Sequence, residues 1–337
     1  MLAAAGGAAT ALAGRVTFHE PESTDALARR LDEAVPRALA AHHVPGAAVA
    51  VVHDGRVAWA RGYGVPVDAR FQVASLSKPV SALGILRLAQ EERFPLTDAV
   101  GWQPAAARFD ARGITLARLL SHTAGLSVGG YGGLAPSGPL PSVTASLQGT
   151  TGDAPAVELL HAPGSRLEYS GGGYSVAQLW AEKASAQPFA AFMRDTVLRP
   201  LGMTGSSFVQ ADLPGDAVAH DASGHAIPAY RYAELAAAGL RSTAPDMARF
   251  AAALMPGPRR VPAEMLHAAP ATGGRWSLGL ELDELGDGTR VVEHEGVSRG
   301  WRSRLVAYPD RGWAIVVLTN GDGGEAVADA AVAQLAR

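Results

Sequence analysis

Cysteine is absent from this 337-residue sequence, and lysine is nearly absent. Without cysteine the chain can have no disulfide, no thiolate metal site and no cysteine nucleophile. No run of 18 apolar residues occurs, so the sequence predicts no membrane-spanning helix. The net charge is only −3 and there is no basic tract, which argues against a nucleic-acid partner. The hydrophobic fraction of 48% is typical of a globular protein with a large core.

The two lysines are Lys78 and Lys183, whereas the other 27 basic residues are arginines. A G+C-rich genome explains a preference for arginine, and it makes the lysine at position 78 more informative. A guanidinium keeps its proton near neutral pH, whereas a buried ammonium can lose it. Lys78 therefore suggests proton transfer, with a surface lysine on a helix as the alternative. We expect Lys183 to be an exposed helix residue.

Lys78 follows a serine by three residues in the sequence Ser75-Leu76-Ser77-Lys78. This S-x-x-K pattern is typical of a serine nucleophile that is activated by a lysine one helical turn away. The apolar pattern from Lys78 to about Gln90 predicts a helix, so Ser75 lies at or just before its N-terminus. There the positive end of the helix favours a serine alkoxide and a bound oxyanion.

Two later segments supply candidate partners for this serine. Tyr169 is a second candidate base, because a tyrosine beside a buried ammonium should have a lowered pKa. Periodicity alone favours the alternative, a core tyrosine with a hydrogen-bonded hydroxyl. His294-Glu295-Gly296 ends a predicted strand, where the histidine could donate to Tyr169 or to a substrate and the glycine permits a close approach of backbone. An exposed histidine at a sheet edge is the alternative there.

Other catalytic motifs fail the test of context. The nucleophile elbow G-x-S-x-G occurs at residues 125–129 and 296–300, but neither match lies between a strand and a helix, as the elbow requires. The zinc motif H-E-x-x-H is absent. We therefore expect neither an α/β-hydrolase site nor a metal, and nothing implies an organic cofactor.

The order of predicted elements places a helical insertion between two halves of one sheet. A helix is expected over residues 24–42, kinked or interrupted at Pro36, followed by a hairpin around Asp54-Gly55. Residues 95–270 look mainly helical, with one helix over 113–126 and an irregular loop over 127–142. Strands return after residue 275, and a helix closes the chain. We predict an α+β fold in which terminal helices flank an antiparallel sheet that carries an all-helical domain.

The predicted boundaries divide the chain into three parts. Residues 15–72 and 272–337 form a discontinuous α/β sandwich domain, and residues 73–271 form the mainly helical domain. Residues 1–14 are a tail or a signal remnant: they are apolar and end in small residues, but they lack the basic start of a secretory signal. Between an exported and a cytoplasmic protein we favour export.

Together these motifs resemble the serine β-lactamase and penicillin-binding-protein superfamily, and more narrowly class C β-lactamases and family VIII carboxylesterases. The resemblance spans roughly residues 40–325 and includes the blocks SLSK, GITLARLLSHTAGL, PGSRLEYSGGGYS, RPLGMTGSSF, AAGLRSTAPDMARF, WSLGLEL and EHEGVSRGW. It implies the β-lactamase/transpeptidase-like fold. It also implies that Ser75 is acylated, that Lys78 is the partner base and Tyr169 the acid/base, and that the backbone N–H groups of Ser75 and Val297 form the oxyanion hole.

The sequence departs from that family at two motifs. Gly171 stands in place of the Asn of Y-x-N, which contacts a substrate amide. His294 and Glu295 stand in place of the Lys and Thr of K-T-G, which hold the carboxylate of β-lactams and D-Ala peptides, and an acidic Glu295 should repel such a carboxylate. We assign these positions and Gly296 to substrate binding. Trp301 is a candidate wall of the cleft, with core packing as the alternative.

These observations predict a serine hydrolase that passes through a Ser75 acyl-enzyme and acts on small-molecule esters or amides. A carboxylesterase fits best, since it needs only an acyl group and a leaving alcohol. The alternatives are a β-lactamase or D-Ala/D-amino-acid peptidase, an acyltransferase, and a non-catalytic penicillin-binding-like sensor. The sequence does not predict the oligomeric state.

Overall fold

The fold is described from a computed structural model that covers residues 17–101, 109–258 and 260–336; the predicted tail, residues 1–14, lies outside these ranges. Six strands form one antiparallel sheet in the order β2-β1-β10-β9-β8-β7. They are β1 (Ala47–His53), β2 (Arg56–Tyr63), β7 (Glu281–Glu284), β8 (Arg290–Ser298), β9 (Trp301–Tyr308) and β10 (Trp313–Thr319). Two short pairs lie outside this sheet: β3 (Phe71–Gln72) with β6 (Arg241–Ser242), and β4 (Ala219–His220) with β5 (Ala226–Ile227).

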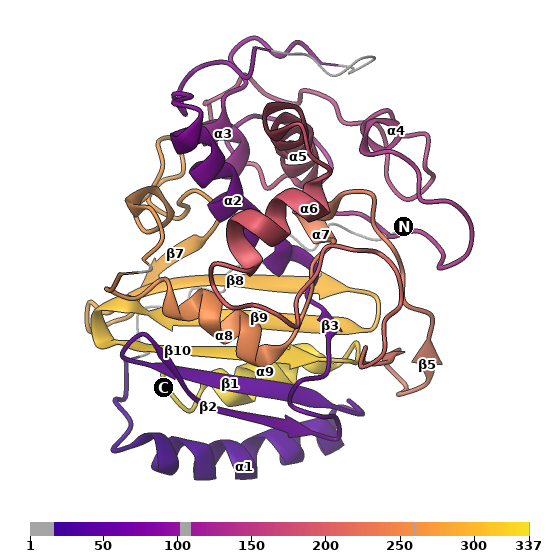
Figure 1. The fold of residues 1–337 in the computed structure, drawn as a ribbon. Helices are drawn as coiled ribbons and strands as arrows, with labels where there is room; N and C mark the ends of the chain where they lie inside the picture. The colour runs from indigo at the N-terminus through magenta and orange to yellow at the C-terminus, as the bar shows by residue number, and fades with distance from the viewer. Residues whose placement is uncertain (1–16, 102–108, 259, 337) are drawn as a thin grey trace.

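The predicted hairpin and the predicted meander meet in this sheet. Asp54 and Gly55 both have positive φ, as a tight two-residue hairpin turn requires, and they connect β1 to β2. β10, the last strand in the sequence, lies between β1 and β9 and joins the two halves (Figure 1). The predicted α+β architecture is therefore confirmed, whereas the domain boundaries stay a prediction.

Strand β1 is apolar throughout because both of its faces are covered. Alternate side chains point to opposite faces of a strand, and those of β1 join two separate hydrophobic clusters. Helices α1 (Thr24–Ala41) and α9 (Gly324–Val332) pack together on one face, while α8 (Ala244–Ala252) covers the other (Figure 1). Helix α1 runs through Pro36 without interruption, so the predicted interruption is wrong, whereas the kink stays a prediction.

The helical part of the chain lies beyond α8, above the sheet in Figure 1. Its helices are η1 (Ala74–Leu76), α2 (Ser77–Glu91), α3 (Leu116–Leu120), α4 (Val143–Leu147), α5 (Gly171–Ser185), α6 (Phe189–Met193), η2 (Arg194–Leu198), α7 (Leu235–Ala238) and η3 (Ala263–Met265). A last short turn, η4 (Pro309–Arg311), connects β9 to β10. The helix predicted over 113–126 is much shorter than expected, because the chain turns into the left-handed region at His122.

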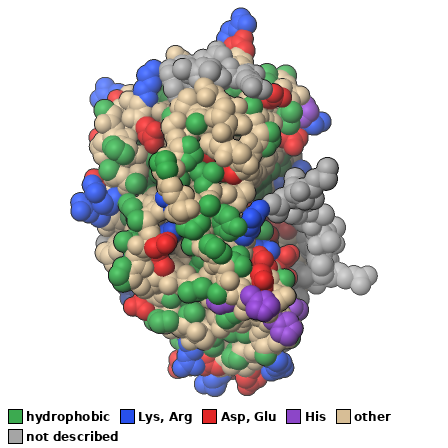
Figure 2. Space-filling view, turned by 90° about the vertical axis from the view of Figure 1, so that its right-hand side faces the viewer, with side chains coloured by type: hydrophobic (Ala, Val, Ile, Leu, Met, Phe, Trp, Pro, Cys, Tyr) green, Lys and Arg blue, Asp and Glu red, His purple; other side chains and the backbone are tan. Residues whose placement is uncertain are grey.

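On the face shown in Figure 2, acidic, basic and hydrophobic side chains are interspersed. Within the described ranges of the chain, no helix is long and apolar enough to cross a bilayer.

Candidate active site

Ser75 lies in a strained turn that leads into helix α2. It belongs to η1, and the residue before it, Ala74, has a φ of +47°. A non-glycine residue in this left-handed region costs about 1 kcal/mol. Two hydrogen bonds hold the turn: the Ser77 hydroxyl donates to the Ala74 carbonyl at 2.6 Å and accepts from the Leu240 N–H at 2.9 Å. The serine is thus fixed at the positive end of a 15-residue helix.

Lys78 lies one turn along α2 and contacts this serine directly. Its Nζ is 2.9 Å from the Ser75 hydroxyl and 2.9 Å from the Ala237 carbonyl, and the side chain is only 1% exposed. Burial lowers the pKa of Lys78 from 10.5 to about 7. The surface-lysine alternative is therefore wrong, and the amine can be neutral near neutral pH. Lys183, by contrast, is exposed on α5, as predicted.

Tyr169 lies against the same pair of groups. The Nζ of Lys78 is 4.9 Å from the centre of the Tyr169 ring, and the Tyr169 hydroxyl interacts with Ser75. Burial raises the pKa of Tyr169 above its ordinary value, and the interaction with Ser75 opposes that rise. The predicted lowering of this pKa is wrong, because the loss of solvent outweighs the interaction with Ser75. Tyr169 is therefore a protonated phenol at neutral pH.

Strand β8 approaches the nucleophile turn so closely that only glycine fits. A Cβ on Gly296 would lie 2.2 Å from the Val73 carbonyl oxygen, and the Ser303 hydroxyl donates to that same oxygen at 2.8 Å. β7 pairs with β8 only as far as Glu293, so among the described residues the following half of β8 has no strand neighbour on that side. η1 packs against β8. This arrangement supports the backbone N–H of Val297 as a partner of the Ser75 N–H in an oxyanion hole.

His294 and Glu295 lie on opposite faces of β8, because side chains alternate along a strand. His294 is 3% exposed and faces the site, with its ring centre 6.2 Å from that of Tyr169. Burial and the charge of Lys78 lower the pKa of His294 to about 3, so its imidazole is neutral. Glu295 instead approaches Arg304, with Oε1 3.5 Å from the guanidinium Nε. The expected repulsion between Glu295 and a substrate carboxylate is therefore wrong.

Gly171 begins helix α5, and an aromatic ring occupies the space where a side chain would be. A Cβ on Gly171 would lie 3.2 Å from the ring of Tyr131 and 3.2 Å from the Gly129 carbonyl. The Tyr131 hydroxyl lies 2.7 Å from that of Ser175 in the same helix. The irregular loop over 127–142 thus reaches the start of α5 beside Tyr169.

Trp301 is a core residue. It is 2% exposed and packs edge-on against Phe71, so the prediction that Trp301 forms a wall of the cleft is wrong. Trp276 takes its place near the site, with its ring centre 5.7 Å from Tyr169 and 5.6 Å from His294. Trp276 lies in the block WSLGLEL, and the family resemblance of that block implied no role for the tryptophan. The sequence separation between Trp276 and the other motifs does not predict this contact, because only the tertiary fold brings its ring beside Tyr169.

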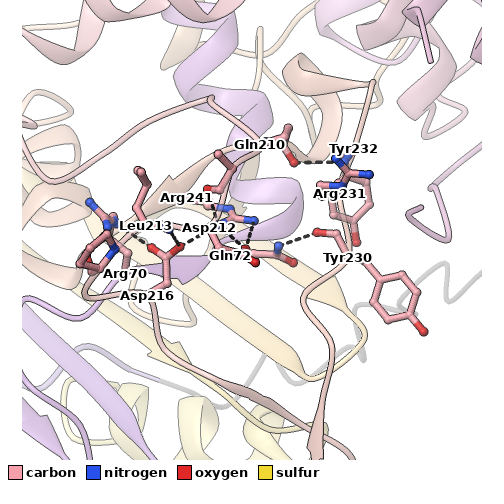
Figure 3. A network of polar contacts seen from close by, with 12 residues as sticks. Arg70, Gln72, Gln210, Asp212, Leu213, Asp216, Tyr230, Arg231, Tyr232 and Arg241 are labelled. Atoms are coloured by element: carbon pink, nitrogen blue, oxygen red, sulfur yellow. Dashed lines mark hydrogen bonds and ion pairs between the residues drawn. The ribbon is translucent and has the colours of Figure 1, made fainter. Parts of the chain in front are cut away.

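A buried ion-pair network anchors the chain just before the nucleophile turn (Figure 3). Arg241 in β6 is 3% exposed and donates to Asp216 at 2.7 Å, and Arg70 donates to the same carboxylate at 2.7 Å. Gln72 in β3 donates to the Tyr230 carbonyl at 2.6 Å. Since β3 leads directly into η1, these contacts fix the approach to Ser75.

Metal ligands do not gather in the part of the chain that the structure describes. No group there of three or more histidine, aspartate or glutamate side chains is placed to hold a metal ion.

Comparisons with known proteins found relatives that match part of their own length. Protein flp of Staphylococcus aureus strain NCTC 8325 is 30% identical over 210 residues, which are 58% of this chain and 41% of protein flp. Esterase EstB of Burkholderia gladioli is 31% identical over 207 residues, 55% of this chain and 53% of EstB. The chain thus spans about two fifths to one half of the length of these relatives.

Solved structures show the same fold over nearly the whole chain. The D-amino acid amidase from Ochrobactrum anthropi SV3, complexed with D-phenylalanine, has a TM-score of 0.76 at 20% identity and matches 91% of this chain and 98% of its own. The β-lactamase/D-alanine carboxypeptidase from Pseudomonas syringae has a TM-score of 0.73 at 16% identity, with coverages of 91% and 99%. At these identities the likeness shows the fold alone. The family model described as Beta-lactamase matches residues 31–337, and the chain therefore belongs to the Beta-lactamase family.

Proposed function

We propose that this protein is a serine hydrolase that forms an acyl-enzyme at Ser75 and acts on small carboxylic esters. The observation that carries the proposal is the 2.9 Å contact between Ser75 and a lysine that is buried and half neutral at pH 7. A base with a pKa near the working pH combines a large neutral fraction with a useful driving force for proton transfer.

The steps of acylation follow from the positions of three groups. Neutral Lys78 takes the proton of the Ser75 hydroxyl as its oxygen attacks the substrate carbonyl. The N–H groups of Ser75 and Val297 bind the oxyanion that forms. The phenol of Tyr169 gives its proton to the leaving alkoxide and regains one from the Lys78 ammonium. A water molecule then attacks the ester carbon under the same base, which releases the acid and restores Ser75.

Two features support an ester rather than a β-lactam or D-Ala peptide. His294 is a neutral imidazole and supplies no cation for a substrate carboxylate. Gly171 supplies no amide, and the ring of Tyr131 fills the adjacent space. The similarity to esterase EstB is consistent with this choice.

A carboxylate-bearing substrate is the second candidate, because Arg299 lies two residues beyond Val297. Its guanidinium stacks on the Tyr230 ring at 4.9 Å and donates to the Tyr230 hydroxyl at 3.0 Å. This exposed arginine makes no ion pair with a carboxylate of the described residues and could bind one on a substrate.

The test compares wild-type protein with Ser75→Ala on p-nitrophenyl acetate and butyrate, with intact-mass detection of the acyl adduct. We expect hydrolysis and the adduct in wild type and neither in the variant. Undiminished hydrolysis by Ser75→Ala would contradict the proposal. Penicillin and a D-Ala dipeptide, run in parallel with and without Arg299→Gln, test the second candidate, and an added alcohol acceptor tests acyl transfer.

A further inference from the structure

His122 is a buried residue that has no role in the proposed mechanism. It is 1% exposed, follows the end of α3 and has a φ of +60°. Such a backbone conformation is uncommon for residues other than glycine, although histidine, like asparagine and aspartate, adopts it more often than most. A strained backbone at this position suggests that the conformation of His122 serves the nearby site.

His122 accepts two hydrogen bonds, one from the residue before Tyr169 and one from the residue after it. The His122 carbonyl accepts the N–H of Glu168 at 2.7 Å, and its Nδ1 accepts the N–H of Ser170 at 3.0 Å. Because these two donors flank Tyr169 in the sequence, the backbone of the tyrosine is fixed before and after it. In this left-handed conformation, His122 contacts the segment 168–170 with both its carbonyl and its ring.

The imidazole ring also supports the phenol itself. The ring centres of His122 and Tyr169 are 4.3 Å apart with an angle of 33° between the planes. The ring of Trp276 lies nearly perpendicular to both, with its centre 5.0 Å from that of His122 and 5.7 Å from that of Tyr169. The tyrosine therefore has little freedom to move away from Ser75.

The hydrogen bonding also fixes the tautomer of His122. Nδ1 accepts an N–H, so it carries no proton, and the ring proton is on Nε2. Burial and the nearby charge of Lys78 hold the pKa of His122 well below 6.5. The ring therefore stays neutral across the working range of pH and does not compete with Lys78 for the proton of Ser75.

From this geometry we infer that His122 is a positioning residue, which holds the Tyr169 phenol at Ser75 through its bonds to the flanking backbone. The inference rests on the proposed function, because it assigns Tyr169 a part in the chemical step. A core histidine that only stabilises the fold is the competing explanation.

The test uses His122→Asn and His122→Ala, because the two changes separate the acceptor from the ring. Asparagine tolerates a positive φ, and its Oδ1 lies near the place of Nδ1, so it keeps the bond to the Ser170 N–H. Alanine loses both. The matched control is His53→Ala, which removes a histidine stacked on Trp313 at 3.9 Å at the end of β1, away from Ser75.

The readout is kcat per active serine, counted by labelling with a fluorophosphonate and intact mass. We expect His122→Ala to lower kcat at least tenfold with KM within about twofold, since mispositioning an acid/base group affects the chemical step. His122→Asn should recover kcat to within about fivefold of wild type, and His53→Ala should match wild type. The inflection of the pH profile near 7 should stay in place, because Lys78 is unchanged.

Two outcomes would overturn the inference: unchanged kcat per labelled serine in His122→Ala, or a folded His122→Asn variant that loses as much as alanine. If the alanine variant does not fold, the asparagine variant decides alone: kcat within about fivefold of wild type supports the inference, and a loss of about tenfold or more overturns it. Should wild type hydrolyse none of the esters, the proposed function fails, but the rate at which the fluorophosphonate labels Ser75 still compares the variants. The same ranking of labelling rates would support the positioning role separately.

Discussion

Replacing Lys78 by arginine tests the central claim that a neutral amine activates Ser75. Arginine keeps the positive charge and the length of the side chain, but its guanidinium does not lose its proton at any working pH. Lys78 has a pKa of about 7, so about half of it is neutral at pH 7. The substitution therefore removes the base and leaves the charge, in a position where the wild-type group is 1% exposed.

The expected loss follows from the size of general base catalysis. That contribution is about 10²- to 10⁴-fold, or about 3–5 kcal/mol of transition-state stabilisation. We expect kcat/KM of Lys78→Arg on p-nitrophenyl butyrate to fall by at least about 100-fold. Lys183→Arg is the matched control, because it makes the same change on the exposed face of α5 and should leave kcat/KM unchanged.

The pH profile of wild type gives an independent measurement. The base must be deprotonated, so activity rises with pH: kcat/KM should increase about fivefold from pH 6 to pH 7 and by about twofold more above it. Retention of more than one tenth of the activity by folded Lys78→Arg would refute the reasoning. A flat wild-type profile between pH 6 and pH 8 would do the same.

Three further results are expected. Lys78→Met should raise the free energy of unfolding by up to about 5 kcal/mol below pH 7, because the wild-type protein must keep a charged amine buried there. This gain should shrink as the pH rises from 7 to 10.5, and thermal denaturation at a series of pH values measures it. Gly296→Ala should abolish esterase activity and lower stability by about 1–3 kcal/mol or more, whereas Gly130→Ala, with nothing within 4 Å of the new Cβ, should resemble wild type in both assays. Arg241→Met removes one of the two arginines that pair with Asp216, whose carboxylate is 17% exposed and keeps Arg70; the loss in urea denaturation should be about 1–3 kcal/mol, and a loss below about 0.5 kcal/mol would contradict that account.

Local signals predicted much of the fold. The hairpin at Asp54-Gly55, the later strands and the terminal helices have periodicities and turns that do not depend on distant contacts. The helix over 113–126 was predicted too long, because its apolar spacing continues past the point where His122 turns the chain. Pro36 was expected to break a helix that in fact continues, held by its buried face against the sheet.

The site was predictable as far as its spacing is local. Ser75 and Lys78 are one helical turn apart, so the sequence alone indicates their contact. The errors at Glu295 and Trp301 concern which face of a strand each side chain occupies, and the alternation from His294 would have corrected the first. Trp276 could not be found, because only the folded chain brings its ring beside Tyr169.

The hydrogen bond from Ser303 to the Val73 carbonyl joins residues 230 positions apart, and β10 inserts between β1 and β9. During synthesis, Val73 therefore leaves the ribosome long before Ser303, which donates to its carbonyl in the folded protein, is made. Strand β8 follows Ser75 and Lys78 far along the sequence, so a nascent chain that already contains this pair still lacks the strand that packs beside it. Pairing between such distant strands is slow, so the site that we propose assembles only after β8, β9 and β10 have been made and have joined the sheet.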